Sequence, residues 1–426
     1  MENKSVKILN SISLRIILQR LLISLGVILF IRIGSFLPIP GINHTDLALY
    51  IQNNPFARNI VSTFSGKNTF VIGLFTLNIF PYINASIFIQ LIIAFSPALS
   101  KLQKEGDLNA RRSLNRLTRF VTLIWAIIQS VGLGLYLRPI LFNWNTQLLF
   151  EIVVWLTTGA MIVLWLSELV TDYGLGNGAS LLIYTNIVSS FPNLCKTLIS
   201  ENLQNLTIPA IIIITSLILL SLCGIVLLQE GVRRIPIISS KQLNQRRIGS
   251  SNIVNNYIPV RLNQAGVMPI ILTTTVLVLP GYISNLGLFP QLNIAISNLS
   301  FLGKITYWIF YFGLILLFSS FYSTIVLNPK DIADQLQKMA VTIPGIRPGV
   351  QTTFYLKKVM NRLTVLGAVI LAILATLPNI IEVILHISSL NGLSTTSLLI
   401  MAGVLVDISK EVDDIIYSNI YKKKYI

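Results

Sequence analysis

The sequence predicts an all-α polytopic membrane protein, and three observations lead to that class. Only 11% of the residues are charged, well below the ~25% of a soluble domain. The apolar residues gather in long uncharged runs such as Asn202–Gln229 and Ile305–Pro329, and each run supplies the ~20 residues that a spanning helix needs. The charges outside these runs are mostly positive and fall in alternate loops.

Ten transmembrane helices are expected, and they divide into two five-helix halves, residues 1–200 and 201–426. The predicted spans cover residues 15–37, 73–97, 117–138, 149–170, 177–193, 207–229, 262–282, 305–327, 363–386 and 394–412. The segment 57–73 is apolar but too short and too polar to cross alone. It is expected to be a surface helix or a re-entrant piece buried in protein.

The loop charges predict the orientation. With ten spans both termini share a side, and that side holds the basic cluster from Lys101 to Arg119 and the basic loops 230–261 and 328–361. The opposite side has only Arg58, Lys67, Arg138, Lys196 and Lys304. By the positive-inside rule, both termini should face the cytosol or an equivalent compartment.

Two spans are interrupted by proline and are more polar than their neighbours. The second contains Asn78-Ile-Phe-Pro81, and the seventh contains Asn263-Gln-Ala-Gly-Val-Met-Pro269. In carriers and channels built from related halves, such interruptions mark the transport pathway. We expect Pro81 to interrupt the helix, with neighbouring helices or water satisfying the carbonyl group that it frees. The alternative is that the prolines of both spans are ordinary kinks packed against other helices.

One stripe of the second span suggests a pore. On a helix, Ile79, Ile83, Ser86 and Gln90 share one face, and the predicted orientation puts Gln90 toward the inside. A water-filled inner funnel that narrows to a dry neck would need such a face. The alternative is a buried helix–helix seam in which Ser86 and Gln90 form interhelical hydrogen bonds.

Two inside loops are longer than topology requires. The loop 230–261 contains Arg233, Arg234, Arg246 and Arg247, and the loop 328–361 presents Arg347 between two proline–glycine corners. Two such basic protrusions on one face suggest docking to a large acidic partner, such as ribosomal RNA or an acidic protein surface. The alternative is that these charges serve topology alone.

Catalysis is not expected. The sequence has no H-E-x-x-H, no P-loop and no nucleophile elbow, and its two histidines and two cysteines suggest neither a metal site nor a disulfide framework. No enzyme activity, cofactor or metal is therefore predicted. No cleavable signal or transit peptide is recognised before the first span.

Several sequence blocks together resemble a known family along nearly the whole chain. The chain is similar to the SecY family of protein-translocation channel subunits in the blocks Ile31-Arg-Ile-Gly-Ser-Phe-Leu-Pro-Ile-Pro-Gly41, Phe64-Ser-Gly66, Pro81-Tyr-Ile-Asn-Ala-Ser86, Lys104-Glu-Gly106, Gly174-Leu-Gly-Asn-Gly178, Glu230-Gly-Val-Arg-Arg-Ile235, Asn263-Gln-Ala-Gly-Val-Met-Pro269, Asn328-Pro329 and Pro344-Gly-Ile-Arg-Pro-Gly349.

The resemblance implies an hourglass pore that passes unfolded preproteins and releases membrane proteins sideways into lipid. The plug helix would lie at about 57–73, with Ser62, Thr63, Phe64, Ser65 and Gly66. The lateral gate would lie between the second and seventh spans, with Asn84, Ser86, Gln90 and Thr274. The constriction would consist of Ile79, Ile83, Ile183, Ile271 and Ile400. A sixth family position falls on Ala179, where a larger aliphatic residue is typical, and this departure bears on how tightly the ring closes.

The resemblance also implies partners: a SecE-like small subunit, a SecG-like subunit, preprotein clients, membrane lipid, and the SecA motor ATPase or the ribosome on the basic loops. The short chain, rich in Ile and Asn, looks like a plastid-encoded member from an alga, in a chloroplast thylakoid membrane with both termini in the stroma. A bacterial inner membrane with cytoplasmic termini is the alternative.

A secondary transporter of small solutes is the alternative function. It would place an ionisable residue near the membrane midplane for ion coupling. The candidates Arg32, Glu168, Asp172, Glu382 and Asp407 all lie near predicted span ends, where long side chains reach the interface.

The predicted topology can be tested with accessible tags. Tags placed after Ile426, within 230–261 and within 328–361 should all react with a membrane-impermeant reagent from the same side, because these segments carry the inside charges. A tag beside Lys67 should react only from the opposite side. A tag within either basic loop that reacts from the Lys67 side would contradict the ten-span topology.

Overall fold

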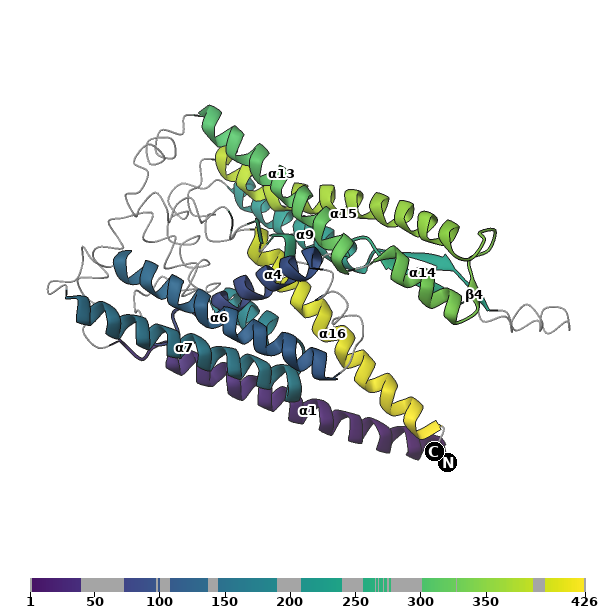
Figure 1. The fold of residues 1–426 in the computed structure, drawn as a ribbon, viewed down its shortest axis with the longest axis horizontal. Coiled ribbons are helices and arrows are strands. Elements are labelled where there is room, and N and C mark those ends of the chain that lie inside the picture. Colours follow the sequence, from purple (N-terminus) through teal and green to yellow (C-terminus); the bar gives the residue numbers. More distant parts are fainter. Residues whose placement is uncertain are drawn as a thin grey trace, which may run out of the picture. The chain divides into compact units, whose positions relative to one another are not determined.

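The computed structural model describes residues 2–39, 73–96, 99, 108–136, 145–189, 208–239, 256–264, 266, 268–270, 272–273, 276, 301–326, 328–385 and 395–424. Helices dominate this part of the chain (Figure 1). They are α1 (Glu2–Gly34), α4 (Phe80–Phe95), α6 (Leu108–Tyr136), α7 (Thr146–Tyr173), α9 (Ile208–Glu230), α13 (Phe301–Val326), α14 (Pro329–Lys338), α15 (Val350–Leu385) and α16 (Thr395–Lys424). The strands are β1 (Val232–Pro236), β2 (Ile238–Ser239), β3 (Tyr257–Arg261) and β4 (Val341–Thr342).

Four helical segments of the described chain are long and apolar enough to cross a membrane: Arg15–Gly34, Arg112–Leu135, Thr146–Tyr173 and Val350–Thr376. Shorter apolar helices cover Phe80–Ile93, Gly178–Ser189, Leu219–Glu230 and Ile309–Ser323. Each of these helices overlaps a predicted span, but Val350–Thr376 begins 13 residues before the predicted span 363–386, inside the predicted loop 328–361. The seventh predicted span is described only in part, so the count of ten stays a prediction.

The chain forms two compact units. One comprises Met1–Asn205, Pro280–Pro290 and Val404–Ile426, and the other comprises Leu206–Leu279 and Gln291–Gly403. The last part of α16 therefore clusters with the first unit, whereas the sequence predicts a single boundary near residue 200. The predicted halves stay a prediction.

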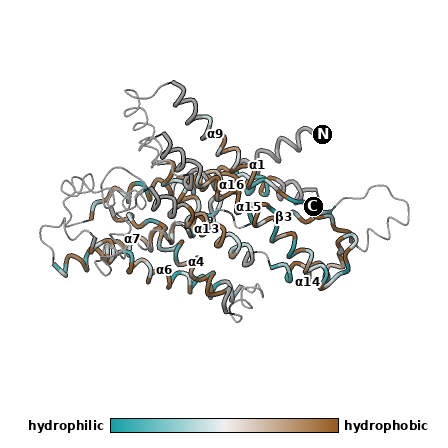
Figure 2. The backbone as a smooth tube through the Cα atoms, turned by 90° about the horizontal axis from the view of Figure 1, so that it is seen from above, coloured by the Kyte–Doolittle hydropathy of each residue, from teal (hydrophilic) through white to brown (hydrophobic). Residues whose placement is uncertain are grey.

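In the first unit, α7 packs against α6 and α1, and α4 packs against α6 (Figure 1). Apolar residues colour much of these helices in Figure 2. Leu22, Leu29 and Ile33 of α1 remain highly exposed in this chain, as expected for side chains that face lipid or another subunit.

The second span begins later than predicted. α4 starts at Phe80 rather than near residue 73, and Pro81 occupies its first turn. A proline there has no intrahelical acceptor to lose, and its fixed φ suits a helix start. The prediction that Pro81 interrupts a helix and frees a carbonyl group was therefore wrong.

In the second unit, α13 and α9 pack against α15, and the two basic loops fold together beside one part of α15 (Figure 1). β1 pairs with β3 within the first loop. β2 of the first loop pairs with β4 of the second. We call the assembly of residues 231–239, 256–262 and 328–363 the basic module. The four short strands were not predicted.

The basic module has its own hydrophobic core. Ile235 and Val260 come from the first loop, and they pack with residues from α14, the turn after β4 and the beginning of α15. The core residues are Ile235, Val260, Ala333, Leu336, Ile343, Leu356, Val359, Met360 and Leu363. The described parts of the two loops, residues 231–239, 256–261 and 328–361, thus form one folded body rather than two separate protrusions.

Candidate functional site

The end of α1 holds the segment that precedes α4. Gly73 forms an isolated antiparallel bridge with Pro38, and the Leu74 N–H donates to the Leu37 carbonyl at 3.0 Å. The Phe75 ring lies so close to Gly34 that a Cβ on Gly34 would clash with it. The described part of the block Ile31–Gly41, residues 31–39, thus ends a helix and then anchors residues 73–75.

The same segment contacts α7. A Cβ added to Gly159 would lie 2.0 Å from the Leu74 carbonyl oxygen, so only glycine allows this approach. Turns then lead to the first turn of α4, where the left-handed Asn78 (φ 48°) accepts the Ile79 N–H through its side-chain oxygen at 2.8 Å. The segment that leads to Ile79 is therefore held through residues 73–75 by contacts with both α1 and α7.

The predicted ring residues of the first unit are placed as follows. Ile79 and Ile83 are buried, at 1% and 4% exposure, and Ile183 is half-buried in the helix Gly178–Ser189. Ile400, in the second unit, is half-buried on α16. Ile271 lies outside the described residues. Both a closed neck and a packed seam bury Ile79 and Ile83, so the ring stays a prediction.

The predicted gate residues of α4 are half-buried. The Ser86 hydroxyl donates to the Ile83 carbonyl of its own helix at 2.9 Å. The Gln90 side-chain oxygen is buried and has no hydrogen-bond partner among the described residues. These contacts do not include the interhelical hydrogen bonds that the seam alternative expected. Asn84 is half-buried as well, and Thr274 lies outside the described residues.

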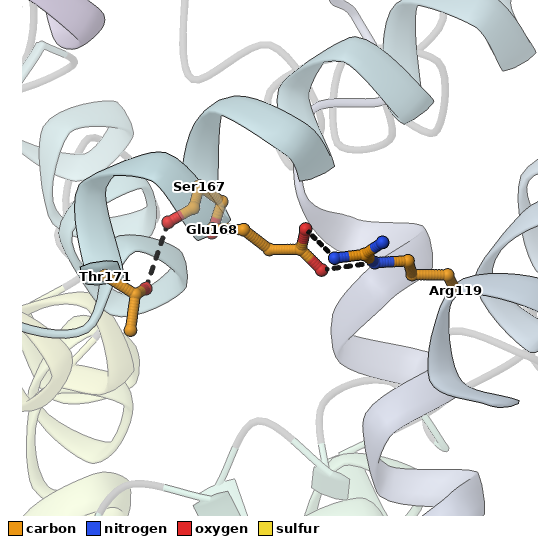
Figure 3. Close-up of polar contacts among 4 residues, drawn as sticks. All are labelled: Arg119, Ser167, Glu168 and Thr171. Carbon is orange, nitrogen blue, oxygen red and sulfur yellow. Dashed lines mark hydrogen bonds and ion pairs between the residues drawn. The ribbon is translucent and has the colours of Figure 1, made fainter. Parts of the chain in front are cut away.

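A glycine-rich turn starts the helix that carries Ile183. The Gly178 N–H donates to the Thr171 hydroxyl at 2.9 Å, and that hydroxyl donates to the Ser167 carbonyl of α7 at 3.0 Å (Figure 3). Gly176 adopts φ +79°, a conformation that favours glycine. The block Gly174–Gly178 therefore fixes the point after α7 at which the helix Gly178–Ser189 begins.

An ion pair ties α6 to α7 close to this turn. Arg119 donates through Nε to Glu168 Oε1 at 2.9 Å and through Nη2 to Glu168 Oε2 at 2.8 Å (Figure 3). Such bidentate geometry is the strong form of a guanidinium–carboxylate pair, although the 53% exposed Arg119 side chain limits its contribution to stability.

The basic module presents Arg347 on a fixed turn. Ile343 is buried in the module core and Ile346 packs against it. The Ile346 N–H donates to the Ile343 carbonyl at 3.1 Å. The Thr352 hydroxyl of α15 donates to the Arg347 carbonyl at 2.9 Å. The backbone is thus held on both sides while the Arg347 side chain is exposed.

The arginines of the first loop lie on β1. Arg233 and Arg234 are exposed, and the Arg234 guanidinium stacks 5.0 Å from the centre of the Tyr257 ring across the ribbon. This cation–π contact orders Arg234 without neutralising it. Arg246 and Arg247 lie outside the described residues, as do the plug residues Ser62, Thr63, Phe64, Ser65 and Gly66.

Sequence reasoning missed the residues that position the site. Gly159 lies in an ordinary apolar stretch, and nothing in the sequence marks it as the contact for residue 74. Arg119 was assigned only to the inside charges, and Glu168 only to a span end. A carboxylate at the inner end of one span facing an arginine of the adjacent one could have suggested their pairing.

Comparison with known proteins identifies close relatives. The SecY family profile matches residues 73–409. The protein translocase subunit SecY of Trieres chinensis is 61% identical over 413 residues, covering 95% of this chain and 97% of the relative. Its counterpart from Synechocystis is 39% identical over 413 residues, covering 95% and 93%.

A solved structure shares the fold. Sec61 in the canine ribosome–channel complex from the endoplasmic reticulum superposes with a TM-score of 0.60 at 16% identity, covering 95% of this chain and 93% of that chain. The predicted helical membrane fold is confirmed by this likeness. The relatives give no support to the alternative of a secondary transporter.

The contact at Gly159 can be tested by adding one methyl group. Gly159→Ala should destabilise the first unit by about 1–3 kcal/mol, because the new Cβ meets a backbone carbonyl that cannot move aside freely. Thermal unfolding of the purified protein would measure the effect. Gly132→Ala in α6 is the matched control, since its Cβ would meet nothing within 4 Å. Equal stability of the two variants would contradict the close approach.

Proposed function

Because the chain belongs to the SecY family and is a protein-conducting channel subunit, we propose that it closes its pore with an isoleucine neck and opens sideways between its second and seventh spans. It passes unfolded preproteins across the membrane and releases membrane proteins into lipid. The match over residues 73–409 carries this proposal. The family is not an enzyme family.

The neck is the proposed seal. Ile79 and Ile83 of α4 meet Ile183, Ile271 and Ile400 in an apolar ring, and a narrow apolar constriction excludes water and ions by dewetting. Branched aliphatic side chains yield around a passing chain without forming specific bonds to it. The fixed segment 73–79 supports this role, because it holds Ile79 on one side of the ring.

The proposed gate and plug complete the channel. Asn84, Ser86 and Gln90 of α4 would face Thr274 of the seventh span, and the plug would comprise Ser62, Thr63, Phe64, Ser65 and Gly66. The Gln90 side-chain oxygen is buried and has no hydrogen-bond partner within the described part of the chain. This supports a gate role, since an unsatisfied polar atom can take up a new partner when the gate changes state.

The basic module is the proposed docking surface. Arg233, Arg234, Arg246, Arg247 and Arg347 would contact phosphates of ribosomal RNA or carboxylates of a SecA-like motor. The planar guanidinium can donate two hydrogen bonds at once to a phosphate or a carboxylate, and an ordered turn holds it in place for this. A SecE-like small subunit, and a SecG-like subunit where one exists, would assemble beside the helices.

The chain is a multi-pass membrane protein. We place it in the chloroplast thylakoid membrane with both termini in the stroma, supported by its likeness to plastid and cyanobacterial relatives and by the basic inside loops.

The proposed neck can be tested with a substitution that makes its lining polar. Ile83→Asn should let water and ions into the closed pore, because an amide removes the apolar lining on which dewetting depends. Ion leak of proteoliposomes holding the assembled channel should rise, and preproteins with weakened signal sequences should pass more easily. Ile83→Val keeps an apolar lining and is the control. An Ile83→Asn channel as tight as the Ile83→Val channel would contradict the neck.

The docking surface is tested by reversing one charge. Arg347→Glu should leave the module folded, because the side chain is exposed, yet should weaken partner-driven transport by about 10-fold or more, as expected for a lost charge-assisted contact. Transport into vesicles and partner affinity would be measured together. Lys338→Glu, an equal charge change at another exposed position of the module, is the control. Equal losses in both variants would show that overall charge, rather than this turn, binds the partner.

A further inference from the structure

The start of the seventh span is a stretch of irregular backbone that side chains hold in place. The Asn263 side chain donates to the Gly266 carbonyl at 2.9 Å, and Gly266 adopts φ +62°. Helical residues appear from Met268 onward in the described part of the segment. Non-helical backbone in a membrane protein needs such internal partners.

A buried polar cluster connects this segment to two helices of the same unit. The Ser323 hydroxyl of α13 lies 2.9 Å from Gln264 Oε1 and 2.7 Å from the Thr364 hydroxyl of α15. Ser323 and Thr364 are only 4% and 6% exposed. The Thr364 hydroxyl also donates to the Met360 carbonyl of α15 at 2.9 Å. Three structural elements therefore meet at Ser323.

The backbone approaches closely at the same place. A Cβ added to Gly367 of α15 would lie 2.3 Å from the Leu262 carbonyl oxygen. Gly367 follows Thr364 by one helical turn, so one face of α15 touches both Leu262 and the hydroxyl cluster. The described residues of segment 262–266, which are 262–264 and 266, are thus held by a backbone contact as well as by side-chain hydrogen bonds.

The protons of the cluster show what Gln264 contributes. Three contacts, Ser323–Gln264, Ser323–Thr364 and Thr364–Met360, share two hydroxyl protons, because each hydroxyl donates once. Gln264 Nε2 is meanwhile buried without a partner among the described residues. Rotating the Gln264 side-chain amide by half a turn exchanges Oε1 and Nε2 and places Nε2 beside the Ser323 hydroxyl. The Nε2 proton then serves the first contact, and the two hydroxyl protons serve the other two. In that rotated orientation Gln264 Nε2 would donate to Ser323, Ser323 to Thr364, and Thr364 to the Met360 carbonyl.

We propose that Ser323 and Thr364 are positioning residues for the seventh span: through Gln264 they latch segment 262–266 onto α13 and α15 and so favour the closed gate. This latch rests on the proposed function, because it assigns the seventh span to the lateral gate. When the lateral gate opens, the helix that forms one of its sides must move, and the contacts that hold the helix determine where it can do so. A few hydrogen bonds, each of modest net strength in a buried site, hold the closed state and still permit opening.

Removing the hydroxyl of Thr364 tests the latch. Thr364→Val keeps the side-chain shape but breaks the chain from Gln264 to Met360. Amide hydrogen exchange within 262–266 should become about 2- to 10-fold faster, the factor expected for one lost hydrogen bond. Ion leak of the assembled channel in proteoliposomes, and passage of a preprotein with a weakened signal sequence, should rise by a similar factor.

Two matched controls separate positioning from general stability. Thr376→Val makes the same change on α15 at a buried hydroxyl whose partners among the described residues are the Ala372 and Ile373 carbonyls of its own helix. Ser320→Ala matches Ser323→Ala on α13, at an exposed hydroxyl that donates to Leu317. Neither control should alter exchange in 262–266 or ion leak.

The possible results separate the existence of the latch from its role in the gate. Unchanged exchange in 262–266 for both Thr364→Val and Ser323→Ala would overturn the latch, and faster exchange with unchanged leak would overturn its role in the gate. Should Thr364→Val fail to fold, Ser323→Ala, which removes a single oxygen, decides alone. A parent protein that transports no preprotein would instead overturn the proposed function, while the exchange measurement would still judge the contacts.

Discussion

Much of this structure depends on one constraint. Inside a membrane, backbone N–H and C=O groups that are not part of a helix must find hydrogen-bond partners within the protein. The chain leaves the helix in two places that matter. Residues 73–79 are held by Leu37 of the α1 end and by the close approach to Gly159. Residues 262–266 are held by the Asn263 side chain and by α15. Both irregular segments lead into helices proposed to form the two sides of the gate.

The basic module meets a different requirement, which is to hold charges rigidly. Its strands are too short to be stable alone, and the burial of Ile235 and Val260 against α14 and α15 supplies the missing stability. Arg347 gains most from this frame, because its turn is bonded to Thr352 and anchored by Ile346. A charged side chain on an ordered backbone loses less conformational entropy on binding than one on a flexible loop.

The helical spans could be predicted because long apolar runs have few alternatives in a membrane. The ribbons of the basic module could not, since β2 and β4 are two residues each and pair across the sequence. Pro81 was misread because proline is as acceptable at a helix start as it is disruptive within one, and periodicity does not separate the two cases. Gly159 and Ser323 carry no sequence signal at all: their roles depend on neighbours that only the folded chain brings near.

The pairing of β2 with β4 has a consequence for biosynthesis. About 100 residues separate Ile238 from its partner Thr342. At translation rates of roughly 5–20 residues per second, the first loop therefore waits about 5–20 s before its partners are made. Throughout that interval Ile235 and Val260 lack most of their core, and Arg233 and Arg234 have no rigid frame. The proposed docking surface is thus complete only after α13 and the beginning of α15 have been synthesised. A nascent or truncated subunit therefore offers no finished surface on which a partner could assemble prematurely.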